Sequence, residues 1–243
     1  MTSAGELAGL LRERQPCVVL TGAGVSTESG IPDFRSTSGI WRHVDPFEVA
    51  SIAAFRRDPE RVWSFYRARI HSLLEAEPNA GHRALAELEQ RGLVQAGVTQ
   101  NIDTLHSRAG SREVVEVHGS IRVAECLRCL WTEQTDGVLA QLEQHPVPLC
   151  AHCGEVLKPG VTLFGELLPA RAMERATALA RSAALMLVVG STLEVWPVAG
   201  LPLEARALAI INRGATALDD QALLRIDAPA GETLSAVAAA MRS

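Results

Sequence analysis

The sequence predicts an α/β fold, in which a Rossmann-like parallel sheet carries a helical insertion and a small inserted zinc-ribbon module. Three observations support this prediction. Short apolar runs alternate with helix-like segments, 47% of the 243 residues are apolar, and four cysteines interrupt the alternation as two C-x2-C pairs. Strands that alternate with helices form parallel sheets covered on both faces. A chain of this length forms one α/β domain with an insertion, or one large and one small domain.

Five apolar runs are the predicted strands, and they cover residues 17–21, 93–98, 114–117, 185–189 and 207–211. The run at 185–189 is apolar throughout, which is typical of a strand buried on both faces. Helices are expected at the chain start and over residues 79–91, 169–182 and 229–241. The helix at 79–91 has a capping Asn79 before it and Gly92 after it.

We expect a single domain over residues 1–243. Its Rossmann-like part is predicted to comprise residues 1–30, 77–119 and 161–243. A loop followed by helices is expected at 31–76, and the zinc module is expected at 120–160, where His145-Pro-Val-Pro148 and few core residues break the strand–helix rhythm.

Composition argues against two classes of partner. The net charge is −5, Lys and Arg are scattered, and only 4% of residues are aromatic, so a nucleic-acid-binding role is disfavoured. No segment approaches the roughly 20 apolar residues of a membrane span, and the first residues lack the basic start of a signal peptide. We expect a cytoplasmic protein without a membrane partner. No coiled-coil pattern argues for an oligomer, so a monomer is expected.

Four of the five cysteines have the spacing of a zinc site: Cys126, Cys129, Cys150 and Cys153. Two thiolates from each of two tight turns can close on one tetrahedral ion. Because all four positions are thiolates, no position stays open for water, and the zinc is expected to be structural. The alternative is two unrelated redox pairs. Cys17 lies within an apolar strand and is expected to be a buried core thiol.

Small or polar residues follow the predicted strands, at the sheet edge where α/β folds bind ligands. They are Gly22, Ala23, Gly24 and Ser26; Gln100, Asn101 and Asp103; His118; Gly190, Ser191 and Thr192; and Asn212, Arg213 and Gly214. Thr27 stands where a dinucleotide-binding fingerprint has Gly or Ala. Each loop alone is also explained as a turn; an Asx turn at Asp103, for example, would cap the next helix. Five such loops at one edge together favour a nucleotide site.

These motifs together resemble the sirtuins, the NAD-dependent protein-lysine deacylases. The matching segments are GAGVSTESGIPDFR (22–35), TQNID (99–103), HG (118–119), the paired C-x2-C and FGE (164–166), and their order and spacing match from about residue 10 to residue 225. The resemblance implies that NAD is a co-substrate that the reaction consumes, and that acylated lysine side chains of proteins are the second substrate.

The resemblance also implies a role for each matching residue. The implied NAD-binding residues are Gly22, Ala23, Gly24 and Ser26 at the phosphates; Asp33, Phe34, Arg35 and Trp41 on the cofactor loop; Gln100, Asn101, Ile102 and Asp103 at the nicotinamide end; and Gly190, Ser191, Thr192, Asn212, Arg213 and Gly214 at the adenosine half. The implied catalytic residues are His118, as general base, and Asn101. The implied peptide-binding residues are Val161, Phe164, Gly165 and Glu166, which would pair with the substrate as an added β-strand.

In the implied reaction the acyl oxygen attacks the ribose carbon that bears nicotinamide. His118 then draws a proton through the ribose hydroxyls, and water completes the release of lysine and O-acyl-ADP-ribose. A histidine is suited to such a transfer at neutral pH.

Tyr66 and Arg69 lie three residues apart on a predicted helix and therefore share one face. Arginine pairs with carboxylates through two parallel hydrogen bonds. The alternative is a partly buried tyrosine beside a solvated arginine. The pair resembles the Tyr-x-x-Arg of desuccinylating sirtuins, which implies removal of succinyl and malonyl groups, with acetyl as a second substrate. The chain departs from that class at Gly160, usually His.

Further departures from the family pattern occur at Ser36, at the Ser191-Thr192 order and at Trp196. Three other functions remain open: a deacetylase only, a mono-ADP-ribosyltransferase, and a non-enzymatic NAD-sensing or zinc-ribbon module. The intact His118 and the FGE motif at 164–166 favour deacylation over ADP-ribose transfer. The complete set of polar loop residues disfavours the non-enzymatic module.

Overall fold

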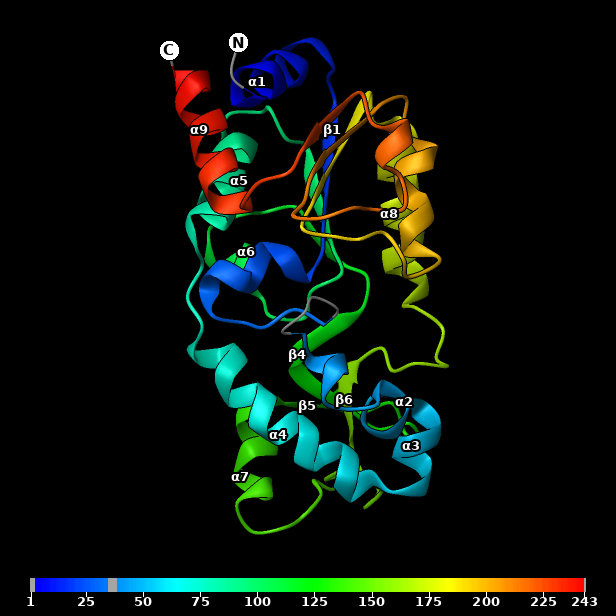
Figure 1. Cartoon of the computed structure of the whole chain (residues 1–243). Helices are drawn as coiled ribbons and strands as arrows, with labels where there is room; N and C mark the ends of the chain where they lie inside the picture. The colour runs from blue at the N-terminus through cyan, green and yellow to red at the C-terminus, as the bar shows by residue number, and fades with distance from the viewer. Residues whose placement is uncertain (1–2, 35–38, 243) are drawn as a thin grey trace.

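The computed structural model describes residues 3–34 and 39–242, and a parallel sheet dominates it (Figure 1). Within the described residues this sheet has six strands in the order β3-β2-β1-β7-β8-β9. They are β1 (Cys17–Thr21), β2 (Ala96–Thr99), β3 (Val114–Glu116), β7 (Leu185–Val189), β8 (Leu208–Ile211) and β9 (Leu224–Ile226). Every neighbouring pair is parallel. This is the Rossmann order, whose switch point lies between β1 and β7.

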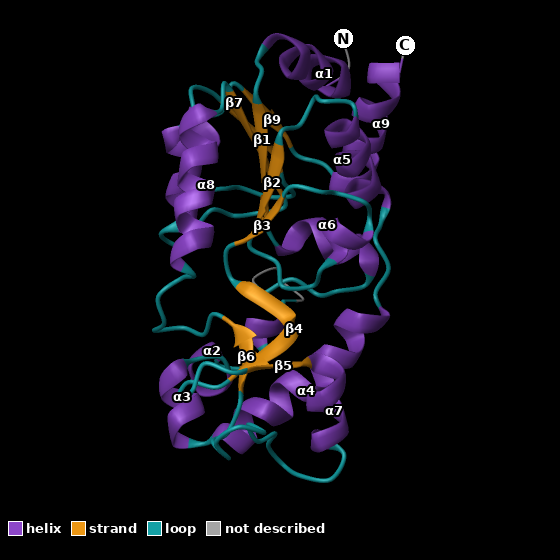
Figure 2. Ribbon diagram, turned by 180° about the vertical axis from the view of Figure 1, so that it is seen from behind, coloured by secondary structure: helices purple, strands orange, loops and turns teal. Residues whose placement is uncertain are grey.

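Helices cover both faces of this sheet, as Figures 1 and 2 show. On one face lie α1 (Ser3–Glu13), α5 (Ala80–Gln90) and α9 (Ala230–Arg242), and on the other lie α8 (Ala170–Ser182) and the 3-10 segment η3 (Val198–Glu204). Alternate residues of β1 serve the two layers: Val19 packs with the α1 side, whereas Val18 and Leu20 pack with the α8 side. The sheet is therefore buried on both faces, as predicted.

The helix α5 begins where the sequence predicts. The Asn79 Oδ1 accepts hydrogen bonds from the backbone N–H of Gly81 at 2.8 Å and of His82 at 3.3 Å. The His82 Nδ1 in turn accepts from the Asn79 backbone N–H at 3.3 Å, which completes a capping box. A cap of this kind contributes about 1 kcal/mol to helix stability.

A second, antiparallel sheet lies beyond the carboxyl edge of the first (Figure 2). Its order is β5-β4-β6, with β4 at Gly119–Glu125, β5 at Thr132–Gln134 and β6 at Lys158–Val161. Around it lie α2 (Pro46–Val49), α3 (Ile52–Arg57), α4 (Pro59–Glu75) and α7 (Thr135–Leu142). Of these helices, α3, α4 and α7 share a separate apolar core with β4 and β6. Trp63 is buried there, and its Nε1 donates to the Leu157 carbonyl at 2.7 Å, which ties α4 to this sheet.

Four short helical segments complete the described chain: η1 (Ala23–Ser29), η2 (Ile40–Arg42), α6 (Leu105–Arg108) and η4 (Asp219–Gln221). None of the helices within residues 3–34 and 39–242 is both long and apolar enough to cross a membrane.

The predicted strands at 17–21 and 185–189 match the structure, but the strand predicted at 93–98 begins only at Ala96. The backbone N–H groups of Leu93 and Val94 donate to the Leu88 carbonyl, so these residues close the end of α5 instead of entering the sheet. The strand predicted at 114–117 ends at Glu116, and the one predicted at 207–211 begins at Leu208.

Candidate active site

The carboxyl ends of the parallel strands open onto one cavity of about 1690 Å³, which extends to the second sheet. Ligand pockets commonly measure roughly 300–1,000 Å³, so this cavity has room for a dinucleotide together with part of a second substrate. Each of the five predicted loops contributes to its lining.

The structure brings the described members of the predicted site together. The lining includes Gly22, Ala23, Gly24, Ser26, Asp33, Phe34, Trp41, Gln100, Asn101, Ile102, Asp103, His118, Gly190, Ser191, Thr192, Asn212, Arg213 and Gly214, and also Tyr66, Arg69, Val161, Phe164, Gly165 and Glu166. Arg35 and Ser36 lie outside the described residues.

The loop after β1 packs directly on the end of β7. The Gly24 N–H donates to the Gly190 carbonyl at 2.9 Å, and a β-carbon on Gly24 would lie 2.8 Å from the Gly190 Cα. The chain then forms the 3-10 helix η1 and ends it at Gly30, which has φ 83°. Because no long α-helix follows, nothing requires a small residue at Thr27, which is exposed and donates to the Gly24 carbonyl. This explains the departure from the dinucleotide fingerprint.

Three buried polar side chains hold this loop against the loop after β2. The Ser26 Oγ donates to the Asp103 Oδ2 at 2.7 Å, and the Asn101 Nδ2 donates to the Ser26 Oγ at 3.0 Å and to the Gly22 carbonyl at 3.1 Å. The Asp103 Oδ1 accepts from the Leu105 N–H at 3.0 Å. The Asx turn that was the alternative explanation of this loop therefore exists, and the same carboxylate also fixes Ser26. Because these buried polar side chains all have hydrogen-bond partners, they hold the two loops rigidly together.

Two buried histidines that the sequence analysis did not predict contact Thr21 and Ser26. The His106 Nε2 lies 2.9 Å from the Thr21 Oγ1, and the His82 Nε2 lies 3.5 Å from the Ser26 Oγ. Burial lowers the pKa of His82 to about 3 and also lowers the pKa of His106, so both rings are neutral at pH 7. His82 carries a signal, since it stands three residues after Asn79, where a capping-box partner is found. Nothing in the sequence marks His106.

His118 lies in the turn between β3 and β4 and lines the cavity. Its Nδ1 lies 2.9 Å from the Gln100 carbonyl oxygen. A carbonyl only accepts, so Nδ1 carries the hydrogen and the Nε2 of the neutral ring holds the free electron pair. Burial lowers the pKa of His118, against a smaller rise from that hydrogen bond. The ring is therefore a neutral base at pH 7.

The four cysteines converge at the far end of the second sheet. Their sulfur atoms all lie within 4.8 Å of one another, and the Sγ–Sγ distances from Cys126 to Cys153 and from Cys129 to Cys150 are both 3.5 Å. Tetrahedral zinc with Zn–S bonds of about 2.3 Å places sulfurs about 3.8 Å apart. The arrangement thus fits one zinc ion with four thiolate ligands. The described lining of the cavity includes none of the four, which agrees with a structural ion.

Tyr66 and Arg69 on α4 both reach the cavity. The Arg69 guanidinium carbon lies 5.4 Å from the centre of the Phe34 ring and 5.5 Å from that of Phe65, within the range of a cation–π contact. Burial raises the pKa of Tyr66 and lowers the pKa of Arg69. A fully solvated surface arginine, the alternative considered above, does not describe this environment.

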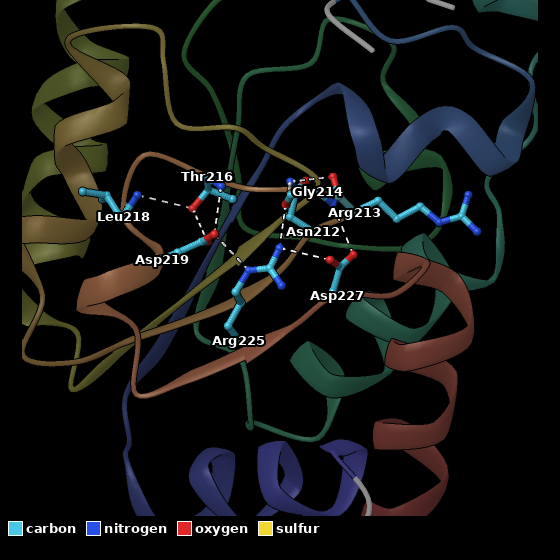
Figure 3. A network of polar contacts seen from close by, with 8 residues as sticks. All are labelled: Asn212, Arg213, Gly214, Thr216, Leu218, Asp219, Arg225 and Asp227. Atoms are coloured by element: carbon cyan, nitrogen blue, oxygen red, sulfur yellow. Dashed lines mark hydrogen bonds and ion pairs between the residues drawn. The ribbon is translucent and has the colours of Figure 1, made fainter. Parts of the chain in front are cut away.

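The loop after β8 is fixed by a polar network that the sequence did not reveal (Figure 3). The Arg225 Nη2 donates to the Gly214 carbonyl at 2.8 Å, and Arg225 also pairs with Asp219 at 3.0 Å and with Asp227 at 3.3 Å. The Asp227 Oδ1 accepts from the Gly214 N–H at 3.2 Å. The Arg213 side chain extends away from this network in Figure 3, so the network shapes the backbone of the loop.

Comparisons with known proteins agree with this architecture. Residues 22–197 match the model of the Sir2 family. The chain is 43% identical to the NAD-dependent protein deacetylase of Thermotoga maritima over 90% of this chain and 91% of that one. It is 45% identical to the NAD-dependent protein deacylase of Thermococcus kodakarensis over 82% and 78% of the two chains.

Solved structures give the same result. A Sir2 complex with a p53 peptide and NAD+ superimposes with a TM-score of 0.87 at 41% identity, covering 94% of each chain. A Sir2 bound to a propionylated peptide gives 0.88 at 40% identity, covering 96% of each chain. The two relatives cover 90% and 82% of this chain and the two structures cover 94% and 96% of it. The protein belongs to the Sir2 family.

Proposed function

We propose that this protein is an NAD-dependent protein-lysine deacylase. The observation that carries the proposal is the neutral His118, with a free Nε2, in a cavity lined by the loops of a Rossmann sheet. Relatives named as deacetylases and deacylases, and Sir2 structures with acyl-peptide or NAD+, support it.

The chain's own residues suit this chemistry. Bound NAD would supply an electrophilic ribose carbon with nicotinamide as the leaving group. The backbone of the Gly22–Ser26 loop would hold the phosphates, since N–H groups at a helix start favour anions. The Phe34 and Trp41 rings stack with centroids 5.0 Å apart at the cavity and would exclude water. His118 would accept the proton that a ribose hydroxyl loses, and the products would be nicotinamide and O-acyl-ADP-ribose.

The acyl group proposed for this site is succinyl or malonyl, with acetyl as a second substrate. Among the described residues no carboxylate forms an ion pair with Arg69, although this guanidinium is half-buried at the cavity. A buried charge needs a partner, and the distal carboxylate of a succinyl chain would provide one. The Tyr66 hydroxyl, three residues before it, would add a second donor.

The departure at Gly160 has a reason in packing. A β-carbon there would lie 2.6 Å from the Val123 carbonyl oxygen, because β6 approaches β4 closely. Gly160 is not among the described residues that line the cavity, so its change does not argue against acidic acyl groups.

The test compares NAD-dependent turnover of matched succinyl-lysine and acetyl-lysine peptides by mass spectrometry. The variants are Arg69→Met, Tyr66→Phe and, as a matched control, Arg67→Met, an exposed arginine on the same helix that is not among the described lining residues. We expect kcat/KM to favour succinyl for the wild type and the control, and to favour acetyl for Arg69→Met. Acetyl preference that Arg69→Met leaves unchanged would refute the acyl assignment alone. ADP-ribose on protein without deacylation would indicate the transferase instead.

A further inference from the structure

Lys158, at the start of β6, is the single lysine of this chain; the other 22 basic side chains are arginines. Its side chain is 1% exposed, so the protein offers no accessible lysine side chain. A chain that uses arginine at every other basic position has a specific need for lysine at this one.

The oxygen atoms around the Lys158 ammonium explain that need. The Nζ donates to the Pro159 carbonyl at 2.9 Å and to the Val161 carbonyl at 2.7 Å. It also pairs with the Glu125 Oε1 at 2.8 Å and with the Glu166 Oε2 at 3.1 Å. A compact ammonium can approach four oxygens at once, whereas the larger guanidinium directs its donors within one plane. The paired carboxylates also make the buried charge tolerable.

These contacts link the two ends of the FGE segment, which we define as residues 161–166. The Glu166 Oε2 that pairs with Lys158 also accepts from the Leu163 N–H at 2.8 Å, and the Glu166 N–H donates to the Leu163 carbonyl at 3.0 Å. Lys158 therefore fixes Val161 directly and fixes Leu163 through Glu166. Each of these residues except Lys158 lines the cavity.

The FGE segment is also joined to the site on both of its flanks. The Thr162 N–H donates to the His118 carbonyl at 2.8 Å. The Phe164 N–H donates to the Ala50 carbonyl at 2.8 Å, and the Phe164 carbonyl accepts from the Ile52 N–H at 3.0 Å. A change in the path of this segment would thus alter both the edge predicted to pair with the acyl-peptide and the neighbourhood of His118.

We propose that Lys158 is a positioning residue for the acyl-peptide: its ammonium holds the FGE segment in the one path that can receive the substrate backbone. This inference rests on the deacylase function proposed above. It assigns Glu166 a role within the segment, as the carboxylate through which Lys158 holds Leu163. The residues proposed to hold the phosphates and the adenosine half of NAD lie on the loops after β1, β7 and β8, outside the FGE segment, so we expect a larger effect on the peptide than on ADP-ribose.

The experiment uses the whole chain with Lys158→Met, which keeps the length of the side chain but removes the ammonium. Because a lone Glu166 carboxylate is left behind, the double variant Lys158→Met/Glu166→Gln provides a second test if the single variant folds poorly. Arg122→Met is the matched control: it removes a cation from the same sheet that pairs with Glu116 at 2.5 Å and contacts no described residue of the FGE segment through a hydrogen bond or ion pair.

Three quantities are measured for each variant: KM for an acylated peptide, the Kd of ADP-ribose by calorimetry, and hydrogen exchange of the Leu163 amide. We expect both Lys158 variants to raise the peptide KM at least about tenfold, since small misplacements of a substrate are costly. The ADP-ribose Kd should stay within about twofold. Lys158→Met should also speed Leu163 exchange, and Arg122→Met should change none of the three.

Parallel loss of peptide and ADP-ribose affinity in both Lys158 variants would overturn the inference, because it would show a general structural role. An unchanged peptide KM would overturn it as well. Neither result touches the proposed function, which fails only if the wild type does not deacylate any peptide.

Discussion

The rings of His82 and His106 meet edge to face, with centroids 4.9 Å apart, directly under the loops that carry Ser26 and Asp103. Both rings are buried, and each makes a hydrogen-bonding contact: the His82 Nδ1 accepts from the Asn79 N–H at the start of α5, and the His106 Nε2 lies 2.9 Å from the Thr21 Oγ1. Two imidazolium ions could not occupy this space, because each would lose its hydration and would repel the other.

The pair therefore makes the fold sensitive to acid. Burial lowers the pKa of His82 to about 3 and lowers the pKa of His106, whereas both titrate near their ordinary value of about 6.5 when unfolded. Well above pH 6.5 the rings are neutral in both states, so they do not make the free energy of unfolding depend on pH. Below it the unfolded chain binds protons that the folded chain does not, so the free energy of unfolding falls by up to about 1.4 kcal/mol per pH unit for each ring.

Chemical denaturation between pH 7.5 and 5 measures this slope. His82→Gln should reduce it, because glutamine can keep the capping contact with Asn79 without titrating. The exposed His145→Gln is the control and should leave the slope unchanged. An equal slope in the wild type and in His82→Gln would contradict the prediction.

The protonation of His118 determines how kcat/KM is expected to change at acidic pH. Its neutral form is the base, and burial lowers its pKa, so kcat/KM should stay level as pH falls to 6.5 and decline only below that value. His118→Asn should lose roughly 10²–10⁴-fold in activity while it still binds ADP-ribose. A variant that loses ADP-ribose affinity to the same extent would show that His118 supports the site instead of acting in the reaction.

The cysteine cluster predicts one zinc ion per chain. Cys129→Ser should lower the zinc content measured by elemental analysis, and a chelator at acidic pH should remove zinc from the wild type, because thiolates must be deprotonated to bind it. Loss of zinc should unfold the β4-β5-β6 region before the parallel sheet, since the two regions have separate cores. Cys17→Ala, which alters a buried core thiol instead, should retain full zinc content.

Local spacing made part of this molecule predictable. The C-x2-C pairs and the Gly22-x-Gly24 loop each bring their chemistry within a few residues, and the apolar runs at 17–21 and 185–189 match their strands because both lie in the centre of the sheet. The three-residue β9 has no comparable pattern, since Leu224–Ile226 includes a charged Arg225.

The missed residues act over long sequence separations. His106 meets Thr21 across 85 residues, and Lys158 meets Glu125 across a whole cysteine module. Neither contact follows from the residues adjacent in sequence, and a lone lysine or histidine has many structural roles. Only the folded chain shows that four oxygen atoms surround the Lys158 ammonium and fix its position.

The contacts of Arg225 are expected to affect the KM for NAD but not the KM for the peptide. Arg225→Met would release the Gly214 carbonyl and leave Asp219 and Asp227 without their shared cation. The loop after β8 would then lose its fixed path, and binding would have to restore it, so we expect the KM for NAD to rise several-fold because ordering a loop costs free energy. The peptide KM should change little, since the FGE segment begins at the end of β6 in the second sheet, whereas Arg225 holds the loop after β8 of the parallel sheet. Arg175→Met, which removes an exposed pair with Glu113, is the control. Steady-state kinetics with each substrate varied in turn would separate the two effects, and an equal rise in both KM values would contradict the prediction.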